Sequence, residues 1–142
     1  MKTETEVHRF SDLQIGMEKN FSLVVDESIV LEFANISGDY NPLHMNDEFA
    51  KTTKFNKRVC HGMLLGSFFS RLVGMHLPGL NSLYMSQTLN FSNPCFLNDK
   101  IIVSGKIKDK SESTKIITLD TLIHNSQGDS LVYGEAKVMF LE

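Results

Sequence analysis

The second half of the chain alternates between apolar and polar positions with a period of two, which is typical of β-strands with one buried face. Turn-rich segments at 93–94, 110–113 and 125–129 divide it into four runs. Short turns between such runs favour antiparallel pairing, and one further strand is predicted earlier, at 18–25. The residues that share the apolar face are Leu83, Met85, Leu89 and Phe91 in the first run, Ile101, Val103 and Ile107 in the second, Ile117, Leu119 and Ile123 in the third, and Val132, Ala136, Val138 and Phe140 in the fourth.

A helix is predicted directly after the strand at 18–25. Asp26 is of the residue type that caps helix N-termini, and Gly38 is of the type that ends helices. Between them, Ile29, Phe33 and Ile36 recur at helical spacing and share one stripe.

The segment after this helix cannot extend it. Pro42 has no backbone N–H and moves the preceding Asn41 out of the helical region. We therefore expect residues 39–44 to form a loop with polar side chains, followed by a short helix over 47–53.

Residues 62–75 are apolar on nearly every face, with Arg71 and two small serines as the exceptions. A helix of this kind is expected to be buried nearly all round, and it needs a curved sheet wrapped about it. The predicted fold class is therefore α+β, with a long central helix and an antiparallel sheet. We expect Met63, Met75 and Met85 to fill the core and the substrate pocket.

Composition narrows the functional classes. The length of 142 residues predicts a single domain over 1–142. The formal net charge of −3 provides no basic surface for a nucleic-acid backbone, so nucleic-acid binding is not expected. Cys60 and Cys95 are too few for a disulfide framework and lack a metal-ligand spacing, which favours a reducing compartment. No stretch has the apolar character of a signal peptide or a membrane span. We therefore expect a cytoplasmic protein that does not bind a membrane.

The candidate chemistry lies in residues 33–50, where Asp39 and His44 stand five residues apart across the loop. A carboxylate and an imidazole that converge on one water can perform general acid and base catalysis near neutral pH. Simpler roles stay open at this point. Asp39 can bond its own backbone in an Asx turn after Gly38, and His44 can be a structural histidine.

The same segment resembles the hydratase 2 motif of the MaoC-like (R)-specific enoyl-CoA hydratases, with Ser-Gly-Asp at 37–39, Asn-Pro-Leu-His at 41–44 and the later Ala50. His-Gly-Met-Leu-Leu at 61–65 and Leu-Pro-Gly at 77–79 resemble the short bacterial members that supply polyhydroxyalkanoate synthesis. The resemblance implies a hot dog fold, in which an antiparallel sheet wraps a long helix. It also implies homodimers that pair through their sheets.

Carried over to this chain, the resemblance implies that Asp39 and His44 activate the water that adds to a trans-2-enoyl thioester, giving a (3R)-hydroxyacyl product. It assigns neither proton transfer to one of the two. The Gly62 N–H, at the start of the long helix, is the candidate donor to the thioester oxygen, unless this glycine only lets the chain turn. Ser70 matches a family serine that reaches toward the carboxylate, and a bond to a carbonyl one turn back is its alternative. Asn41 is expected to fix the loop through local backbone bonds.

A local basic cluster follows, made of Lys51, Lys54, Lys57 and Arg58. It can meet the phosphates of coenzyme A or the acidic surface of an acyl carrier protein, or it can be a solvated face. We expect His61 to brace the loop and not to transfer protons. The resemblance implies no metal and no cofactor besides the carrier of the substrate.

The leading hypothesis is the reversible hydration of trans-2-enoyl-CoA, and three alternatives remain. The same motif occurs in dehydratases that act on (3R)-hydroxyacyl groups bound to acyl carrier protein in fatty-acid or polyketide synthesis. A hot dog thioesterase would use acids at other positions. A non-catalytic acyl-thioester sensor would lose the catalytic pair, and the intact Asp39 and His44 argue against it.

Overall fold

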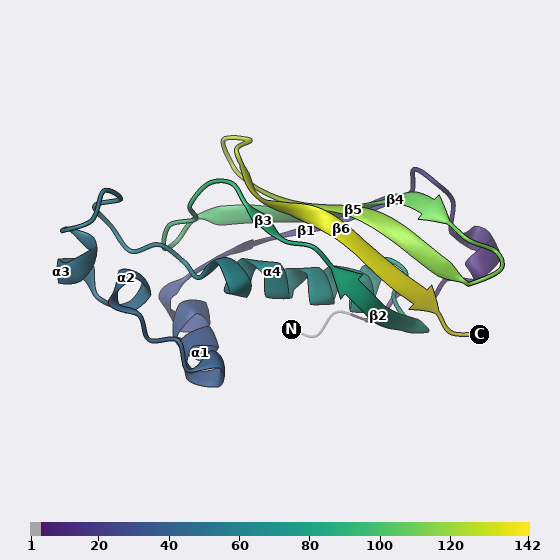
Figure 1. Cartoon of the computed structure of the whole chain (residues 1–142), viewed down its shortest axis with the longest axis horizontal. Coiled ribbons are helices and arrows are strands. Elements are labelled where there is room, and N and C mark those ends of the chain that lie inside the picture. The colour runs from purple at the N-terminus through teal and green to yellow at the C-terminus, as the bar shows by residue number, and fades with distance from the viewer. Residues whose placement is uncertain (1–3) are drawn as a thin grey trace.

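The structure is a computed structural model that describes residues 4–142, so the first three residues of the predicted domain lie outside the described part. A six-stranded sheet carries one long helix along a single face (Figure 1). The strand order is β1-β4-β5-β6-β2 with β3 also paired to β6, and every pair is antiparallel. The strands are β1 (Glu18–Val24), β2 (Ser82–Gln87), β3 (Asn90–Phe91), β4 (Lys100–Lys110), β5 (Ile116–Asn125) and β6 (Ser130–Phe140).

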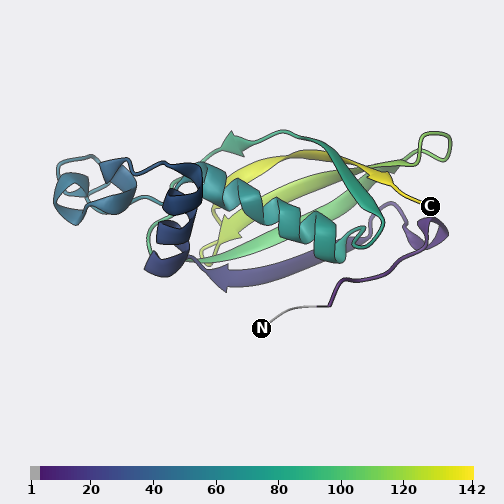
Figure 2. The ribbon, with the colours of Figure 1, turned by 90° about the horizontal axis from the view of Figure 1, so that it is seen from below.

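The helices lie on one side of this sheet. Figure 2 shows α4 crossing the sheet, α1 beside its first turn, and the short α2 and α3 beyond the end of the sheet. The arrangement confirms the predicted α+β fold of a central helix and a curved antiparallel sheet. The helical segments are η1 (Phe10–Asp12), α1 (Glu27–Ser37), α2 (Pro42–Met45), α3 (Asp47–Ala50), α4 (Gly62–Arg71) and the π-helical turn η2 (Leu72–His76).

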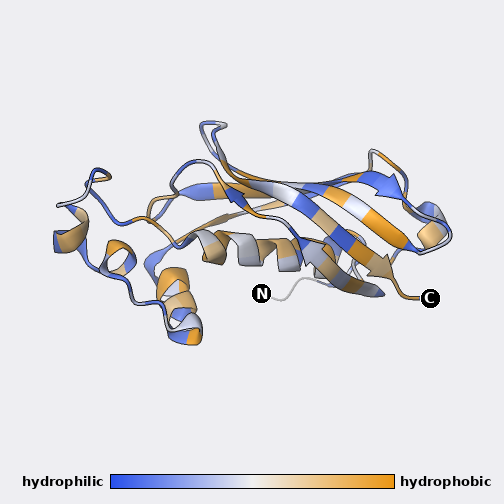
Figure 3. Cartoon of the chain, viewed as in Figure 1, coloured by the Kyte–Doolittle hydropathy of each residue, from blue (hydrophilic) through white to orange (hydrophobic). Residues whose placement is uncertain are grey.

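The predicted alternation is confirmed in β4, β5 and β6. Apolar and polar residues alternate along these strands, as the hydropathy colours in Figure 3 show. The apolar side chains pack against α4, η2 and the N-terminal segment, where they form the core. The buried members of these strands include Ile101, Val103, Ile107, Ile117, Leu119, Ile123, Val132, Ala136, Val138 and Phe140.

The predicted face of the first run is wrong in β2. Leu83 and Met85 are exposed, at 49% and 51%, whereas Tyr84 packs against the core. A register shift between Tyr84 and Ser86 then changes the face, so that Leu89 packs inward again. A bulge of this kind is common at the edge of a sheet, where β2 lies.

The first helix begins and ends where the sequence indicates. The Asp26 side chain accepts a hydrogen bond from the Ile29 backbone N–H, and Gly38 adopts a left-handed conformation (φ 79°). The predicted stripe is wrong at its end, because Ile36 is 86% exposed. The side chains that α1 buries completely are Val30 and Ala34, which lie one helical turn apart.

The segment after Gly38 is more helical than predicted. Pro42 does not extend α1, which ends at Gly38, and it begins the one-turn helix α2. Proline fits this first helical position because a backbone N–H there needs no partner within the helix. The predicted helix over 47–53 is shorter and ends as α3 at Ala50. Both one-turn helices are capped by asparagine side chains, Asn41 and Asn46.

The long helix is buried on one side only, so the prediction of burial nearly all round is wrong. Leu64, Leu65 and Phe69 face the sheet. The opposite stripe, which includes Met63 and Ser70, is exposed, and Met63 is 58% exposed. Met63 and Met85 are therefore not core residues in the single chain. None of the helices in residues 4–142 is long and apolar enough to cross a membrane.

Candidate active site

The loop between α1 and α2 is held by two successive side-chain turns. One carboxylate oxygen of Asp39, Oδ1, accepts a hydrogen bond from the Asn41 backbone N–H at 3.1 Å. The Asn41 Oδ1 in turn accepts from the Leu43 N–H at 3.0 Å, which is the local role expected for Asn41. The Asx turn of Asp39 is therefore present, and it occupies only one of the two carboxylate oxygens.

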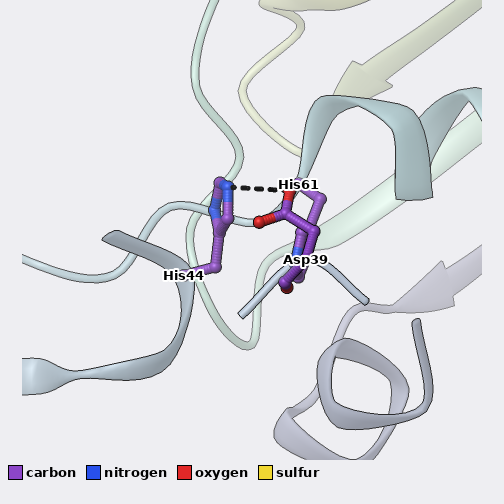
Figure 4. Close-up of side chains that lie close together, drawn as sticks. All are labelled: Asp39, His44 and His61. Atoms are coloured by element: carbon purple, nitrogen blue, oxygen red, sulfur yellow. Dashed lines mark hydrogen bonds and ion pairs between the residues drawn. The ribbon is translucent and has the colours of Figure 1, made fainter. Parts of the chain in front are cut away.

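The second carboxylate oxygen faces His44. Asp39 Oδ2 lies 3.9 Å from His44 Nε2 (Figure 4). His44 Nδ1 donates to the Val59 carbonyl at 2.6 Å, so in the neutral ring Nε2 carries the free lone pair. Two acceptor atoms 3.9 Å apart can both contact one water at about 2.8 Å. The loop thus presents a carboxylate and an imidazole to a single water position.

Arg58 stabilises this arrangement, so its side chain is neither the phosphate contact nor part of the solvated face that the sequence left open. Its side chain is only 5% exposed. Its Nε donates to the His44 carbonyl at 2.7 Å, and its guanidinium pairs with Glu27 Oε1 at 2.8 Å. Both bonds join segments distant in the chain, so local sequence offered no signal for them.

The three lysines of the basic cluster differ in their surroundings. Lys51 is exposed and pairs with Glu48 at 3.2 Å. Lys57 lies over the Phe96 ring, 4.2 Å from its centroid. Lys54 lines an apolar pocket that His44 and Gly62 also line. Of the cluster, Lys54 is therefore the side chain placed to meet a ligand at the pocket.

The pocket adjoins the Asp39–His44 pair and has a volume of about 570 Å³. His44 and Gly62 both line it, together with apolar side chains that include Met63 and Phe91. Cys60 and Cys95 also line it as free, buried thiols. The pocket is apolar apart from a few polar groups, which suits an acyl chain with a polar head.

Gly62 is the first residue of α4, and its N–H has no hydrogen-bond acceptor among the described residues. A Cβ built at this position would approach the Phe91 ring to 2.8 Å. The site therefore requires glycine for packing, and it leaves the N–H at the start of a helix, where a developing anion is favoured.

Ser70 lies about two turns further along α4 and is exposed. No hydrogen bond within residues 4–142 joins its hydroxyl to Asp39 or to a helix carbonyl. The role of Ser70 beside the carboxylate stays a prediction.

His61 contacts both members of the pair, which local sequence did not reveal. Its Nε2 lies 3.0 Å from the Asp39 carbonyl oxygen, and its ring stacks on His44 with centroids 4.0 Å apart. Burial lowers the pKa of His61, although the hydrogen bond to Asp39 opposes this effect. One donor atom from each of Asp39, His44 and His61 lies within 4.8 Å of the others, close enough for a metal ion to bridge. The expectation of a metal-free site stays a prediction.

Comparison with known proteins agrees with this site. Residues 11–127 match the MaoC like domain family. The chain is 40% identical to an (R)-specific enoyl-CoA hydratase of Aeromonas caviae over 89% of this chain and 94% of that protein. It is 33% identical to an (R)-specific enoyl-CoA hydratase of Rhodospirillum rubrum over 94% of this chain and 92% of that protein.

The fold agrees as well. A solved (R)-hydratase from A. caviae, described as involved in PHA biosynthesis, superposes with a TM-score of 0.88 at 39% identity. The match covers 90% of this chain and 97% of that one. With a family match over most of its length and relatives aligned nearly end to end, the chain belongs to the MaoC-like domain family.

Proposed function

We propose that this protein is an (R)-specific enoyl-CoA hydratase, a hydro-lyase that adds water reversibly to trans-2-enoyl-CoA. The observation that carries the proposal is the free Asp39 Oδ2 facing His44 Nε2 at 3.9 Å beside the apolar pocket. The relatives named above support the same activity, since two of them are (R)-specific enoyl-CoA hydratases.

The reaction proceeds by attack of the held water on C3 of the enoyl group. One of the pair, Asp39 or His44, takes a proton from the water as its oxygen bonds to C3. The electron pair of the C2–C3 double bond moves toward the thioester, and the Gly62 N–H donates to the thioester oxygen as charge develops there. The pair then delivers a proton to C2 on the same face and returns to its starting protonation state. The product is (3R)-hydroxyacyl-CoA, with the atoms of one water added.

Coenzyme A is the proposed carrier. Lys54 stands at the pocket, where an ammonium group can meet a phosphate of the coenzyme. Two mitochondrial 3-hydroxyacyl-[acyl-carrier-protein] dehydratases also match: one of Arabidopsis thaliana, 36% identical over 63% of this chain and 53% of that protein, and one of Solanum lycopersicum, 33% identical over 89% of this chain and 77% of that protein. The closer agreement in length with the CoA hydratases favours coenzyme A.

A homodimer is part of the proposal. The single chain exposes large apolar side chains on α4 and on the strands β2 and β3, and large exposed apolar side chains are typical of an interface. These side chains are Met63, Leu83, Met85 and Phe91, with exposures of 58%, 49%, 51% and 53%. A partner that covers them would also enclose the pocket, which Met63 and Phe91 line. The cytoplasmic location expected from the sequence stays a prediction.

The test is turnover of crotonyl-CoA and longer trans-2-enoyl-CoA substrates, followed as loss of the conjugated enoyl absorbance. Chiral chromatography should give the (3R) product, because the pair and the Gly62 donor lie in one fixed site and activate water on one face. Release of free thiol would instead identify a thioesterase, and faster turnover of acyl-carrier-protein thioesters would identify the dehydratase. Binding of enoyl-CoA without turnover would instead identify a non-catalytic acyl-thioester sensor. Light scattering that found only a 16.0 kDa species at micromolar concentration would contradict the dimer.

A further inference from the structure

His61 is a buried histidine that contacts both Asp39 and His44. It precedes the first turn of α4 and is only 2% exposed. Its ring stacks on His44 at an interplanar angle of 29°, and Phe33 of α1 packs against it with ring centroids 4.9 Å apart. Figure 4 shows the His61 and His44 rings side by side, and with the tilted Phe33 ring they connect α1, α2 and the start of α4. Replacing the His61 ring would therefore alter the packing that orients the His44 ring.

The hydrogen bonds determine which nitrogen of each ring carries the proton. Because a carbonyl oxygen only accepts, the bond to Asp39 requires the proton of His61 on Nε2. His61 Nδ1 is then an unprotonated acceptor, and it is buried without a hydrogen-bond partner among residues 4–142. In His44 the order is reversed, with the proton on Nδ1 and the lone pair of Nε2 facing Asp39. The two stacked rings thus hold opposite tautomers.

A positive charge on His61 would be costly. It would place an N–H at Nδ1 with no acceptor, and it would put two cations in stacked rings 4.0 Å apart. The titratable groups that face His61 within residues 4–142 are Asp39 and His44, while α1 contributes only the Phe33 ring. Burial and the nearby His44 both lower the pKa of His61, in agreement with a neutral ring.

We propose, resting on the hydratase function above, that His61 is a positioning residue: it fixes Asp39 through its carbonyl, orients the His44 ring by stacking, and leaves the catalytic proton to His44 and Asp39. His61 does not touch the substrate's reacting atoms. It acts on the pair by holding the two groups at the separation that a single water can bridge.

Nitrogen-15 NMR of the imidazole rings tests this in the substrate-free, unmodified protein. We expect the Nε2–H tautomer in His61 and the Nδ1–H tautomer in His44. As the pH is lowered through the range in which a free imidazole protonates, about pH 6.5, the His61 signals should keep the neutral pattern. Protonation of His61 at or above that pH would overturn the proposal. This result does not depend on whether the protein hydrates enoyl-CoA.

Two substitutions separate the contributions of the ring and the hydrogen bond. His61→Phe keeps a flat ring on His44 but loses the donor to Asp39, whereas His61→Gln keeps a donor but loses the stack. We expect each to lower kcat by about 10²-fold with a much smaller change in KM, and to shift the pH dependence of kcat. The matched control is His124→Phe in β5, because His124 also has a buried, unpartnered Nδ1 but lies elsewhere in the sheet.

The control should keep the kcat and pH profile of the unmodified protein. Folded His61 variants that also kept both would overturn the proposal while leaving the hydratase function intact. No hydration by the unmodified protein would instead contradict the proposed function alone.

Discussion

Replacing Asp39 separates its structural role from its catalytic one, because each of its two oxygens performs one of them. In Asp39→Asn, the amide oxygen can still accept from the Asn41 N–H, so the turn is kept. The second oxygen, which faces His44 at 3.9 Å, becomes an NH2 group. In Asp39→Ala both are lost. The two variants should therefore share the catalytic defect and differ in stability.

The magnitudes follow from these contacts. Loss of a positioned acid or base lowers kcat by about 10²–10⁴-fold, which corresponds to roughly 3–5 kcal/mol in the barrier. We expect this loss in both variants. Only Asp39→Ala also breaks the hydrogen bond to Asn41, and the free energy of unfolding should fall by about 1 kcal/mol. For a chain of this length, that lowers Tm by roughly 3–5 °C.

Both quantities are measured on the same preparations, kcat by enoyl-CoA hydration and Tm by circular dichroism. The matched control is Asp109→Asn, an exposed aspartate of β4 that should change neither value. A folded Asp39→Asn with near-normal kcat would refute the catalytic role. Equal stability of the Asn and Ala variants would refute the structural role of the turn.

Four further outcomes are expected. Gly62→Ala should lower kcat, since the added Cβ would approach the Phe91 ring to 2.8 Å. Adding Phe91→Ala should restore much of kcat if the backbone N–H at 62 is unchanged, and no recovery would show that the steric conflict is not the cause. Arg58→Met should lower both Tm and kcat by removing the bond to the His44 carbonyl, and normal kcat would contradict its role in holding His44. Burial alone would raise the pKa of Glu6, but hydrogen bonds from Lys19 and His76 outweigh this effect and lower the pKa. Unfolding experiments should therefore show the free energy of unfolding falling as the pH drops below about 4.3, and Glu6→Gln should lose less. Dialysis against EDTA should leave kcat unchanged, and loss of activity restored by a divalent cation would show that the Asp39–His44 site needs a metal.

The sequence alone determined the first helix, the main strands and the reactive residue types. Period-two alternation predicted β4, β5 and β6 with the correct buried faces, because side chains on a strand alternate regardless of distant contacts. The cap at Asp26 and the stop at Gly38 were also predicted, since both depend on the local backbone. The motif spacing identified Asp39 and His44 as candidates, but it did not establish their separation.

Tertiary structure decided the rest. The bulge in β2 reversed the faces of Leu83 and Met85, and the sheet covered only one side of α4, leaving Met63 exposed. Arg58 was expected to meet a phosphate or to lie on a solvated face, yet it binds the His44 carbonyl; His61 does brace the loop at Asp39, but its stacking on the His44 ring was not predicted. These contacts join residues 14 and 17 positions from His44, and nothing in the local pattern specifies them. Hydrophobic periodicity records which face of an element is buried, whereas the partner that a polar side chain meets depends on how the elements pack.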